Sequence, residues 1–271
     1  LQARGVGSST LVALCLEPGI GLVTGLLAIL KAGGAYVPID PYHLEARAGA
    51  VLDDARPSLV LTSAELGESL RALDPSAAGL ALFCPDDDAA VVNLQATGNL
   101  AVHDPNALVH VVYTSGSTGR PKGVLGTHRG EANRLEWMRR RFPYGDEEVG
   151  CLKTSLNLID CFSEIFWPLT QGRPLVIAGA EQARDPRQLL ALLGEYGVTR
   201  LVAVPSLLRA LVEGFHDLGQ RLGALTLCMS CGEPLSWSLA QAFGERMPHC
   251  QLINLYGSTE ACADVSYYVI P

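Results

Sequence analysis

Positive charge is scarce in this chain. Its 271 residues include 20 lysines and arginines against 28 aspartates and glutamates, for a formal net charge of −8. A surface that binds nucleic acid needs clustered positive charge. The one basic run, RRR at 139–141, lies at the end of a helix-like segment, where positive charges stabilise the C-terminal end of a helix. The charge balance therefore argues against a nucleic-acid-binding protein.

Long apolar runs are also missing. The most apolar stretch, residues 20–30, is too short to cross a bilayer and lacks the position and flanks of a signal peptide. We therefore expect no membrane association and a cytoplasmic location. Because 48% of the residues are hydrophobic, the chain can still bury a substantial core, in one large domain or in two.

Cysteine is present but not in a disulfide framework. The eight cysteines lack the dense spacing of a small secreted scaffold, and no N-x-[ST] sequon occurs, so we expect reduced thiols. Cys228-Met-Ser-Cys231, followed by His249-Cys250, has the residue types of a zinc site. Because Cys228 lies in an apolar run, where free cysteine is an ordinary buried residue, we favour burial over zinc.

The stretch YTSGSTGRPKGV, residues 113–124, has little apolar surface to bury. Glycines let backbone N–H groups approach an anion, hydroxyls add donors, and Lys122 adds a positive charge. The stretch follows an apolar run at 108–112, the usual place of a nucleotide-binding loop in α/β proteins. Pro121 before Lys122 departs from the P-loop spacing. We interpret the stretch as a phosphate-binding loop of another kind, with an ordinary Ser/Gly-rich hairpin tip as the alternative.

Short β-rich runs alternate with helical patterns along the chain. The expected strands are 10–16, 35–39, 58–62, 108–114, 174–178, 199–204 and 225–229, and the expected helices are 20–31, 45–53, 129–140, 186–196, 205–215 and 236–246. Alternation of this kind predicts a doubly wound α/β fold, with mostly parallel sheets flanked by helices on both faces. The segment 142–148 is the expected internal boundary.

Three segments together resemble the signatures of one family. YTSGSTGRPKGV is similar to the phosphate-loop signature of the adenylate-forming superfamily, and more narrowly of the adenylation domains of nonribosomal peptide synthetases. LLAILKAGGAYVPIDP at 26–41 resembles an upstream structural signature, and NLYGSTE at 254–260 resembles the adenine and magnesium signature. They occur in the family's order, and the resemblance covers essentially the whole chain.

The resemblance implies that the loop holds the β- and γ-phosphates of ATP, which leave as pyrophosphate. The residues concerned are Thr114, Ser115, Gly116, Ser117, Thr118, Gly119 and Lys122. The implied reaction is attack of a substrate carboxylate on the α-phosphorus to give an acyl adenylate. Catalysis would then rest on positioning and charge neutralisation, with Lys122, Thr259 and Glu260 as the catalytic residues.

The NLYGSTE segment would supply the rest of the nucleotide site. By resemblance, Tyr256 stacks on adenine and Asn254 meets its exocyclic amine. Gly257 lies in the same site, and Thr259 touches the α-phosphate. Glu260 would bind Mg²⁺, a hard cation that prefers carboxylate oxygens.

The family's domain continues well beyond the last residue of this sequence. The resemblance therefore implies that the aspartate that grips the ribose, the hinge and the C-terminal lid with its catalytic lysine are missing. We expect residues 1–271 to form a partial adenylation domain that cannot complete turnover alone. Its expected partner is a carrier domain that bears phosphopantetheine.

The substrate pocket also has a counterpart in the family. Where α-amino acids are activated, an aspartate near the start of the segment equivalent to 158–169 anchors the ammonium. Anchoring the comparison on EIFWPL at 164–169 puts Ile159 at that position and Asp160 one residue later. The other expected lining positions are Ser163, Ala203, Met229, Cys231, Leu255, Ala263 and Asp264. Asp160 and Asp264 would then bracket one cation in a largely apolar pocket, where an unpaired carboxylate is costly.

The position of Asp160 bears on the substrate. Moving the anchor by one residue shifts it by roughly 2 to 4 Å, which fits an amine on the β-carbon. The pattern resembles pockets of the family that take β-alanine. A one-residue deletion in the segment would instead return Asp160 to the usual place and favour an α-amino acid.

Other functions stay open from the sequence. An acyl-CoA synthetase would share the signatures, although two acidic pocket residues argue against a purely apolar acyl chain. A nucleotide-binding module without catalysis is a further alternative, and the presence of both Lys122 and Glu260 argues against it. The thiol acceptor stays open too.

Overall fold

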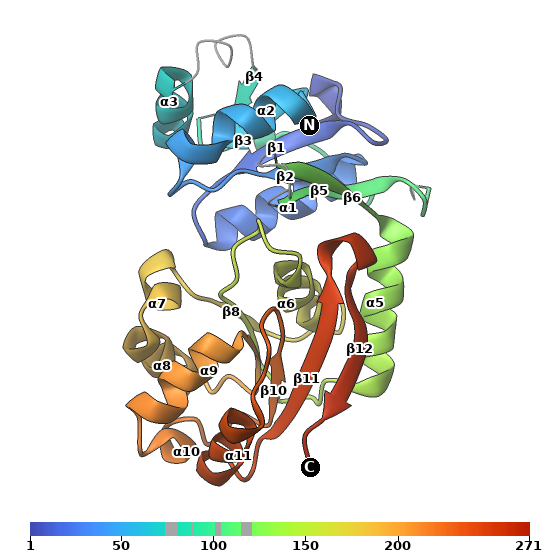
Figure 1. Ribbon diagram of the computed structural model, residues 1–271. Helices are drawn as coiled ribbons and strands as arrows, with labels where there is room; N and C mark the ends of the chain where they lie inside the picture. Colours follow the sequence, from blue (N-terminus) through green and yellow to red (C-terminus); the bar gives the residue numbers. More distant parts are fainter. Residues whose placement is uncertain (74–80, 88, 101–103, 115–120) are drawn as a thin grey trace. The chain divides into compact units, whose positions relative to one another are not determined.

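The computed structural model describes residues 1–271 except 74–80, 88, 101–103 and 115–120 (Figure 1). Its contacts divide the chain into two compact units. The first comprises Leu1–Ala132 and Ser155–Asn157, and the second comprises Asn133–Thr154 and Leu158–Pro271. Each unit contains a mostly parallel sheet, so the expected α/β class is confirmed.

A six-stranded sheet forms the centre of the first unit, in the order β4-β3-β1-β2-β5-β6. Its strands are β1 (Leu11–Cys15), β2 (Ala35–Pro38), β3 (Leu59–Thr62), β4 (Ala81–Phe83), β5 (Leu108–Thr114) and β6 (Lys122–Thr127). Every neighbouring pair is parallel except β5 and β6, which are antiparallel. The parallel strands require crossovers, and helices supply most of them.

Helices cover both faces of this sheet. The helical elements of the first unit are η1 (Gln2–Arg4), α1 (Ile20–Ala32), the π-helical η2 (Leu44–Ala48), α2 (Gly49–Ala55), α3 (Ala64–Leu73) and α4 (Ala89–Val92). On one face α1 packs so closely that a Cβ on Gly25 would lie 3.3 Å from Leu14 Cδ1. On the other face Ala13 packs with Val51 and Leu52 of α2. Successive residues of β1 therefore pack on opposite faces of the sheet, as in any strand that is buried on both faces.

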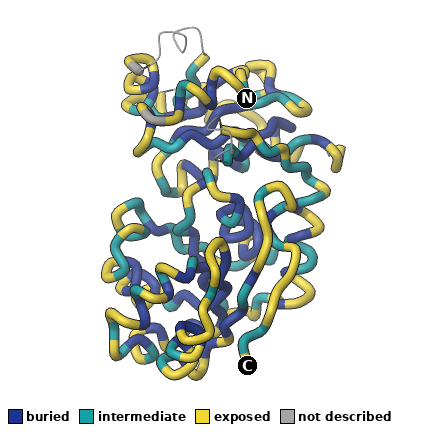
Figure 2. The backbone as a smooth tube through the Cα atoms, in the orientation of Figure 1, coloured by how far each residue is buried: buried dark blue, intermediate teal, exposed yellow. Residues whose placement is uncertain are grey.

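The second unit holds a four-stranded sheet in the order β12-β11-β10-β9. Its strands are β9 (Arg200–Ala203), β10 (Leu227–Ser230), β11 (Gln251–Ser258) and β12 (Ala263–Val269), and β7 (Gly150–Leu152) and β8 (Leu175–Ile177) form a separate parallel pair. The strands β9, β10 and β11 are parallel, whereas β12 is antiparallel to β11. As an edge strand, β12 is exposed along most of its length (Figure 2).

Helices also cover both faces of the second sheet. The helical elements of this unit are α5 (His128–Arg141), which begins in the first unit, α6 (Asp160–Leu169), α7 (Ala180–Arg184), α8 (Pro186–Glu195), α9 (Pro205–Gly214), α10 (Leu218–Arg221), α11 (Trp237–Arg246) and the 3-10 turn η4 (Thr259–Ala261). Leu201 and Cys228 pack against α8, α9 and α11. The opposite face forms what we name the α5–α6 cluster, whose buried members are Met138, Phe142, Trp167, Val202, Leu227, Met229, Cys231, Ile253 and Leu255.

Each expected strand and helix has a counterpart within a few residues. The expected helix at 45–53 is split, because its first turn is the π-helix η2. The eight cysteines are free, in agreement with reduced thiols. Along the described part of the chain, no helix is long and apolar enough to cross a membrane.

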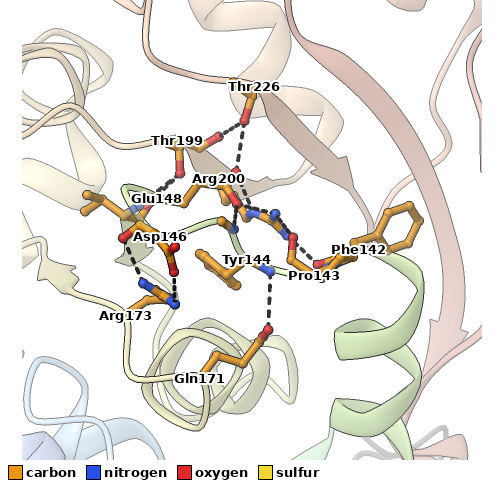
Figure 3. A network of polar contacts seen from close by, with 12 residues as sticks. Phe142, Pro143, Tyr144, Asp146, Glu148, Gln171, Arg173, Thr199, Arg200 and Thr226 are labelled. Atoms are coloured by element: carbon orange, nitrogen blue, oxygen red, sulfur yellow. Dashed lines mark hydrogen bonds and ion pairs between the residues drawn. The ribbon is translucent and has the colours of Figure 1, made fainter.

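The segment 142–148, our expected internal boundary, lies inside the second unit and is held there by Arg200 (Figure 3). The Arg200 guanidinium donates to Glu148 Oε1 at 3.1 Å and to Oε2 at 2.6 Å. It also donates to the carbonyl oxygens of Phe142, at 2.5 Å, and Pro143. The same group lies 4.1 Å from the centre of the Tyr144 ring. A buried arginine on β9 thus fixes the backbone of this segment.

We expect Arg200→Met to destabilise the second unit by about 3 kcal/mol, because Glu148 and two carbonyl groups lose their charged donor. Urea unfolding monitored by the fluorescence of Trp167, whose ring lies 4.8 Å from the guanidinium, measures the change. Arg209→Met is the matched control, since Arg209 is exposed and pairs with Glu213 on its own helix. Equal midpoints for both variants would contradict the prediction.

The same pair has a pH dependence. Burial raises the pKa of Glu148, but hydrogen bonds from Arg200 and the Gly145 amide outweigh it and leave the pKa below its ordinary value of 4.5. A carboxyl whose folded-state pKa is depressed stabilises the fold above the unfolded pKa. The contribution of Glu148 is therefore present above about pH 4.5 and is lost as the pH falls further.

Candidate functional site

The phosphate-loop stretch connects two antiparallel strands. Thr114 at the end of β5 pairs with Lys122 at the start of β6, and Tyr113 pairs with Gly123. The described ends of the stretch are therefore paired with each other in one antiparallel ladder. Lys122 is exposed and Thr114 is half-buried. Ser115, Gly116, Ser117, Thr118 and Gly119 lie outside the described residues, so their phosphate contacts stay a prediction.

The NLYGSTE segment lies mainly on a strand, which is not among the strands expected from the sequence. Asn254, Tyr256 and Gly257 lie on β11, and Thr259 and Glu260 form the turn η4 directly after it. Leu255 faces the α5–α6 cluster, so its neighbours Asn254 and Tyr256 leave the strand on the opposite side. The Tyr256 side chain is 72% exposed, and Glu260 is exposed too.

Gly257 has a structural role besides its expected place in the nucleotide site. The ladder between β11 and β12 is irregular at Tyr256 and Gly257, and the returning strand approaches closely there. A Cβ on Gly257 would lie 1.3 Å from the carbonyl oxygen of Ala263. Cys262 and Ala263 both adopt left-handed φ angles, 59° and 70°, to complete the turn. The backbone that leads to Asp264 is therefore closely constrained.

Three of the nine expected substrate positions lie on the α5–α6 cluster's face of the second sheet. Met229, Cys231 and Leu255 belong to the α5–α6 cluster, whereas Ala203 packs in the core on the opposite face. Ile159 is the N-cap residue of α6 and is buried. Asp160 is the first residue of α6, and its carbonyl accepts a hydrogen bond from the Ser163 hydroxyl at 2.8 Å. The last two expected positions lie on β12, where Ala263 is buried and Asp264 follows it.

Asp160 and Asp264 converge on one cation, the guanidinium of Arg134. Arg134 Nη2 lies 3.1 Å from Asp160 Oδ1 and 2.7 Å from Asp264 Oδ2. Arg134 Nε also donates to Asp264 Oδ2 at 2.7 Å, and Nη1 donates to the Ile159 carbonyl at 3.4 Å. We expected the two carboxylates to bracket a cation, but Arg134 was not among the expected residues. Nothing in its local sequence marks it, because its partners lie 26 and 130 residues away.

Cys231 belongs to the same group of side chains. Burial raises the pKa of its thiol, and the carboxylates of Asp160 and Asp264 raise it further. The thiol therefore stays protonated at neutral pH and hydrogen-bonds to Asp160. Asp160, Asp264, Arg134 and Cys231 form what we name the acidic cluster.

Metal-binding side chains are sparse in the described part of the chain. Among those residues, no three His, Cys, Asp or Glu side chains gather closely enough to hold a metal ion. His249 instead contacts the Leu222 carbonyl, at 3.2 Å, and Cys228 is fully buried. A site that uses one carboxylate and substrate phosphates, as Mg²⁺ often does, is compatible with Glu260.

Known proteins resemble this chain over its full length. Residues 1–271 match the model of the AMP-binding enzyme family. The "Beta-alanyl-bioamine nonribosomal peptide synthetase ebony" of Drosophila melanogaster is 39% identical over 266 residues, which are 95% of this chain and 30% of that protein. "Enterobactin synthase component F" of Escherichia coli K12 is 35% identical over 271 residues, which are 99% of this chain and 20% of that protein.

Solved structures share the fold. The nonribosomal peptide synthetase FmoA3 in its α-methyl-L-serine-AMP bound form gives a TM-score of 0.88 at 29% identity, over 100% of this chain and 30% of that one. Its AMPPNP bound form gives a TM-score of 0.87, over 99% of this chain and 28% of that one. This chain thus spans less than a third of these relatives. By its match over residues 1–271, the chain belongs to the AMP-binding enzyme family.

Proposed function

We propose that the protein containing this chain activates β-alanine, or a similar short β-amino acid, as its adenylate. ATP with Mg²⁺ would supply the adenylyl group, pyrophosphate would leave, and the aminoacyl group would pass to a phosphopantetheine thiol on a carrier domain. One observation carries the proposal: Asp160 and Asp264 converge on Arg134 near Cys231, and the buried Ile159 directly precedes Asp160.

The acidic cluster supports a β-ammonium rather than an α-ammonium. Ile159 occupies the place where an α-ammonium would need its anchor, and its buried side chain offers no hydrogen bond. Asp160 stands one residue later, on the first turn of α6. The name of the Drosophila relative, a β-alanyl-bioamine synthetase, agrees with this assignment.

The nucleotide residues that the structure describes fit ATP. The exposed ring of Tyr256 is open to stacking, and Asn254 leaves the strand on the same side. Glu260, exposed at the turn after β11, would hold Mg²⁺, and Lys122 would neutralise phosphate charge. When bound, the ion neutralises phosphate oxygens, while the residues of this chain position the substrate.

A second candidate is activation of an α-amino acid. The α-methyl-L-serine-AMP bound to FmoA3, a structural relative at 29% identity, favours that class. In this chain, an α-amino acid would place its ammonium group against the side chain of Ile159. Losing a charge-assisted hydrogen bond in a poorly hydrated pocket costs about 1.5 to 3 kcal/mol, roughly ten- to a hundredfold in selectivity.

The test is ATP–pyrophosphate exchange by the full-length protein with a panel of carboxylic acids. The panel contains β-alanine, γ-aminobutyrate, glycine, the standard α-amino acids and a fatty acid. We expect β-alanine to give the highest kcat/KM, by about tenfold or more over any α-amino acid. An α-amino acid as the best substrate would favour the second candidate, and exchange with the fatty acid alone would overturn both.

A further inference from the structure

Arg134 and Asp264 are the most buried charged side chains of the acidic cluster. The exposed fraction of each side chain is 4%, against 21% for Asp160. Its guanidinium joins residues from α5, α6 and β12. Ion pairs on the surface contribute little to stability. The ion pairs of Arg134 are buried, so breaking one would leave a charge without hydration or a partner, at a large cost in free energy.

The contacts of Arg134 are unequal. Two of its nitrogens lie 2.7 Å from Asp264 Oδ2, whereas a single contact of 3.1 Å reaches Asp160. Charge-assisted hydrogen bonds of 2.7 Å are at the short, strong end of the range. Asp264 is thus held closely by Arg134. Asp160, more exposed and less tightly held, is the carboxylate better placed to accept a second cation.

The charges of the cluster can be counted. By formal charge, the two carboxylates and the guanidinium of the cluster sum to −1. Lys153, which also acts on Cys231, is itself paired with Glu164 at 3.4 Å and adds no net charge. One ammonium group on a substrate would bring the cluster to neutrality, and two would leave an excess positive charge in a poorly hydrated place.

We propose that Arg134 is a positioning residue that restricts the site to amino acids with a single ammonium group. It neutralises Asp264 and leaves Asp160 for the substrate ammonium, and it holds both carboxylates in place. The inference rests on the proposed function and adds to it the residue that sets the charge of the pocket. Without Arg134 the cluster carries −2, which favours a substrate with two ammonium groups.

The test uses the full-length protein and compares β-alanine with 2,4-diaminobutyrate, which carries two ammonium groups at neutral pH. The readout is the ratio of their kcat/KM values in pyrophosphate exchange. Two variants change the net charge of the cluster, Arg134→Gln to −2 and Asp264→Asn to 0. The double variant keeps the wild-type charge of −1. Arg140→Gln is the control, because Arg140 is exposed on the same helix and pairs with Glu136.

We expect Arg134→Gln to shift the ratio toward 2,4-diaminobutyrate by about 10- to 100-fold, through KM more than kcat. The double variant should return the ratio to within about threefold of the wild type, because the two charge changes compensate. If Arg134 served only the stability of the fold, the substitution would lower kcat/KM for both substrates equally. An unchanged ratio in Arg134→Gln, or no recovery in the double variant, overturns the proposal.

Two further outcomes are separable. If Arg134→Gln does not fold, Asp264→Asn and the double variant still differ only at residue 134, and the double variant alone should keep the wild-type ratio. If the wild type prefers an α-amino acid, the proposed β-amino acid function fails. The charge inference then stands or falls on that amino acid and its diamino counterpart in the same variants.

Discussion

Replacing Asp160 with alanine should abolish pyrophosphate exchange with β-alanine. The substrate ammonium would enter a pocket whose remaining walls include the buried side chains of Ile159 and Met229, without its main partner. Removing one partner of a buried ion pair costs about 3 to 5 kcal/mol, which corresponds to a loss of more than about 100-fold. Asp160→Asn should fail as well, since an amide supplies a hydrogen bond but no charge.

The same substitution should leave the fold nearly intact. Arg134 keeps its contacts of 2.7 Å with Asp264, so no buried guanidinium is left unpaired. We expect the thermal midpoint of Asp160→Ala to stay within a few degrees of the wild type, a change of about 1 kcal/mol. Asp217→Ala is the control, because Asp217, the N-cap residue of α10, is half-exposed and pairs with Arg221 one turn later. Wild-type exchange by Asp160→Ala would remove Asp160 from the substrate site.

Strands and helices with a buried periodic pattern were predictable from the sequence. The strands β1, β9 and β10 are buried along nearly their whole length, and each is a short apolar run bounded by polar residues or proline. The strand β12 was missed for the opposite reason. Its sequence ADVSYYV is exposed at most positions, so it carries no alternation that indicates a core. Its pairing with β11 defines it as a strand, and pairing is a long-range property.

The candidate site was predictable only in part. The comparison anchored on EIFWPL named Asp160 and Asp264 as pocket positions, but it did not indicate Arg134, which occupies an ordinary position on the polar helix α5. The three side chains come from α5, α6 and β12, and only the fold brings them together. The expected boundary at 142–148 has a similar explanation. Its sequence FPYGDEE has the composition of a linker, while the partner that fixes it, Arg200, lies more than fifty residues away on β9.

Gly257→Ala should disrupt the turn that carries Asp264. The added Cβ would lie 1.3 Å from the Ala263 carbonyl oxygen and 2.9 Å from the Asp264 Cα, and backbone atoms cannot give way as a side chain can. The turn has little freedom to adapt, because Cys262 and Ala263 already hold left-handed φ angles. The start of β12 must therefore move away from β11, and the pairing of Asp264 with Arg134 must change with it.

We expect this variant to lose about 3 kcal/mol or more of stability, and its exchange activity to fall below detection. Unlike Asp160→Ala, it should lower the thermal midpoint and the activity together. Gly244→Ala is the matched control, since Gly244 lies in α11 and a Cβ there meets nothing within 4 Å. That control should be neutral or stabilising, because alanine is the better helix former. A Gly257→Ala protein with the midpoint and the exchange rate of the wild type would show that the β11–β12 turn is not closed as tightly as the structure has it.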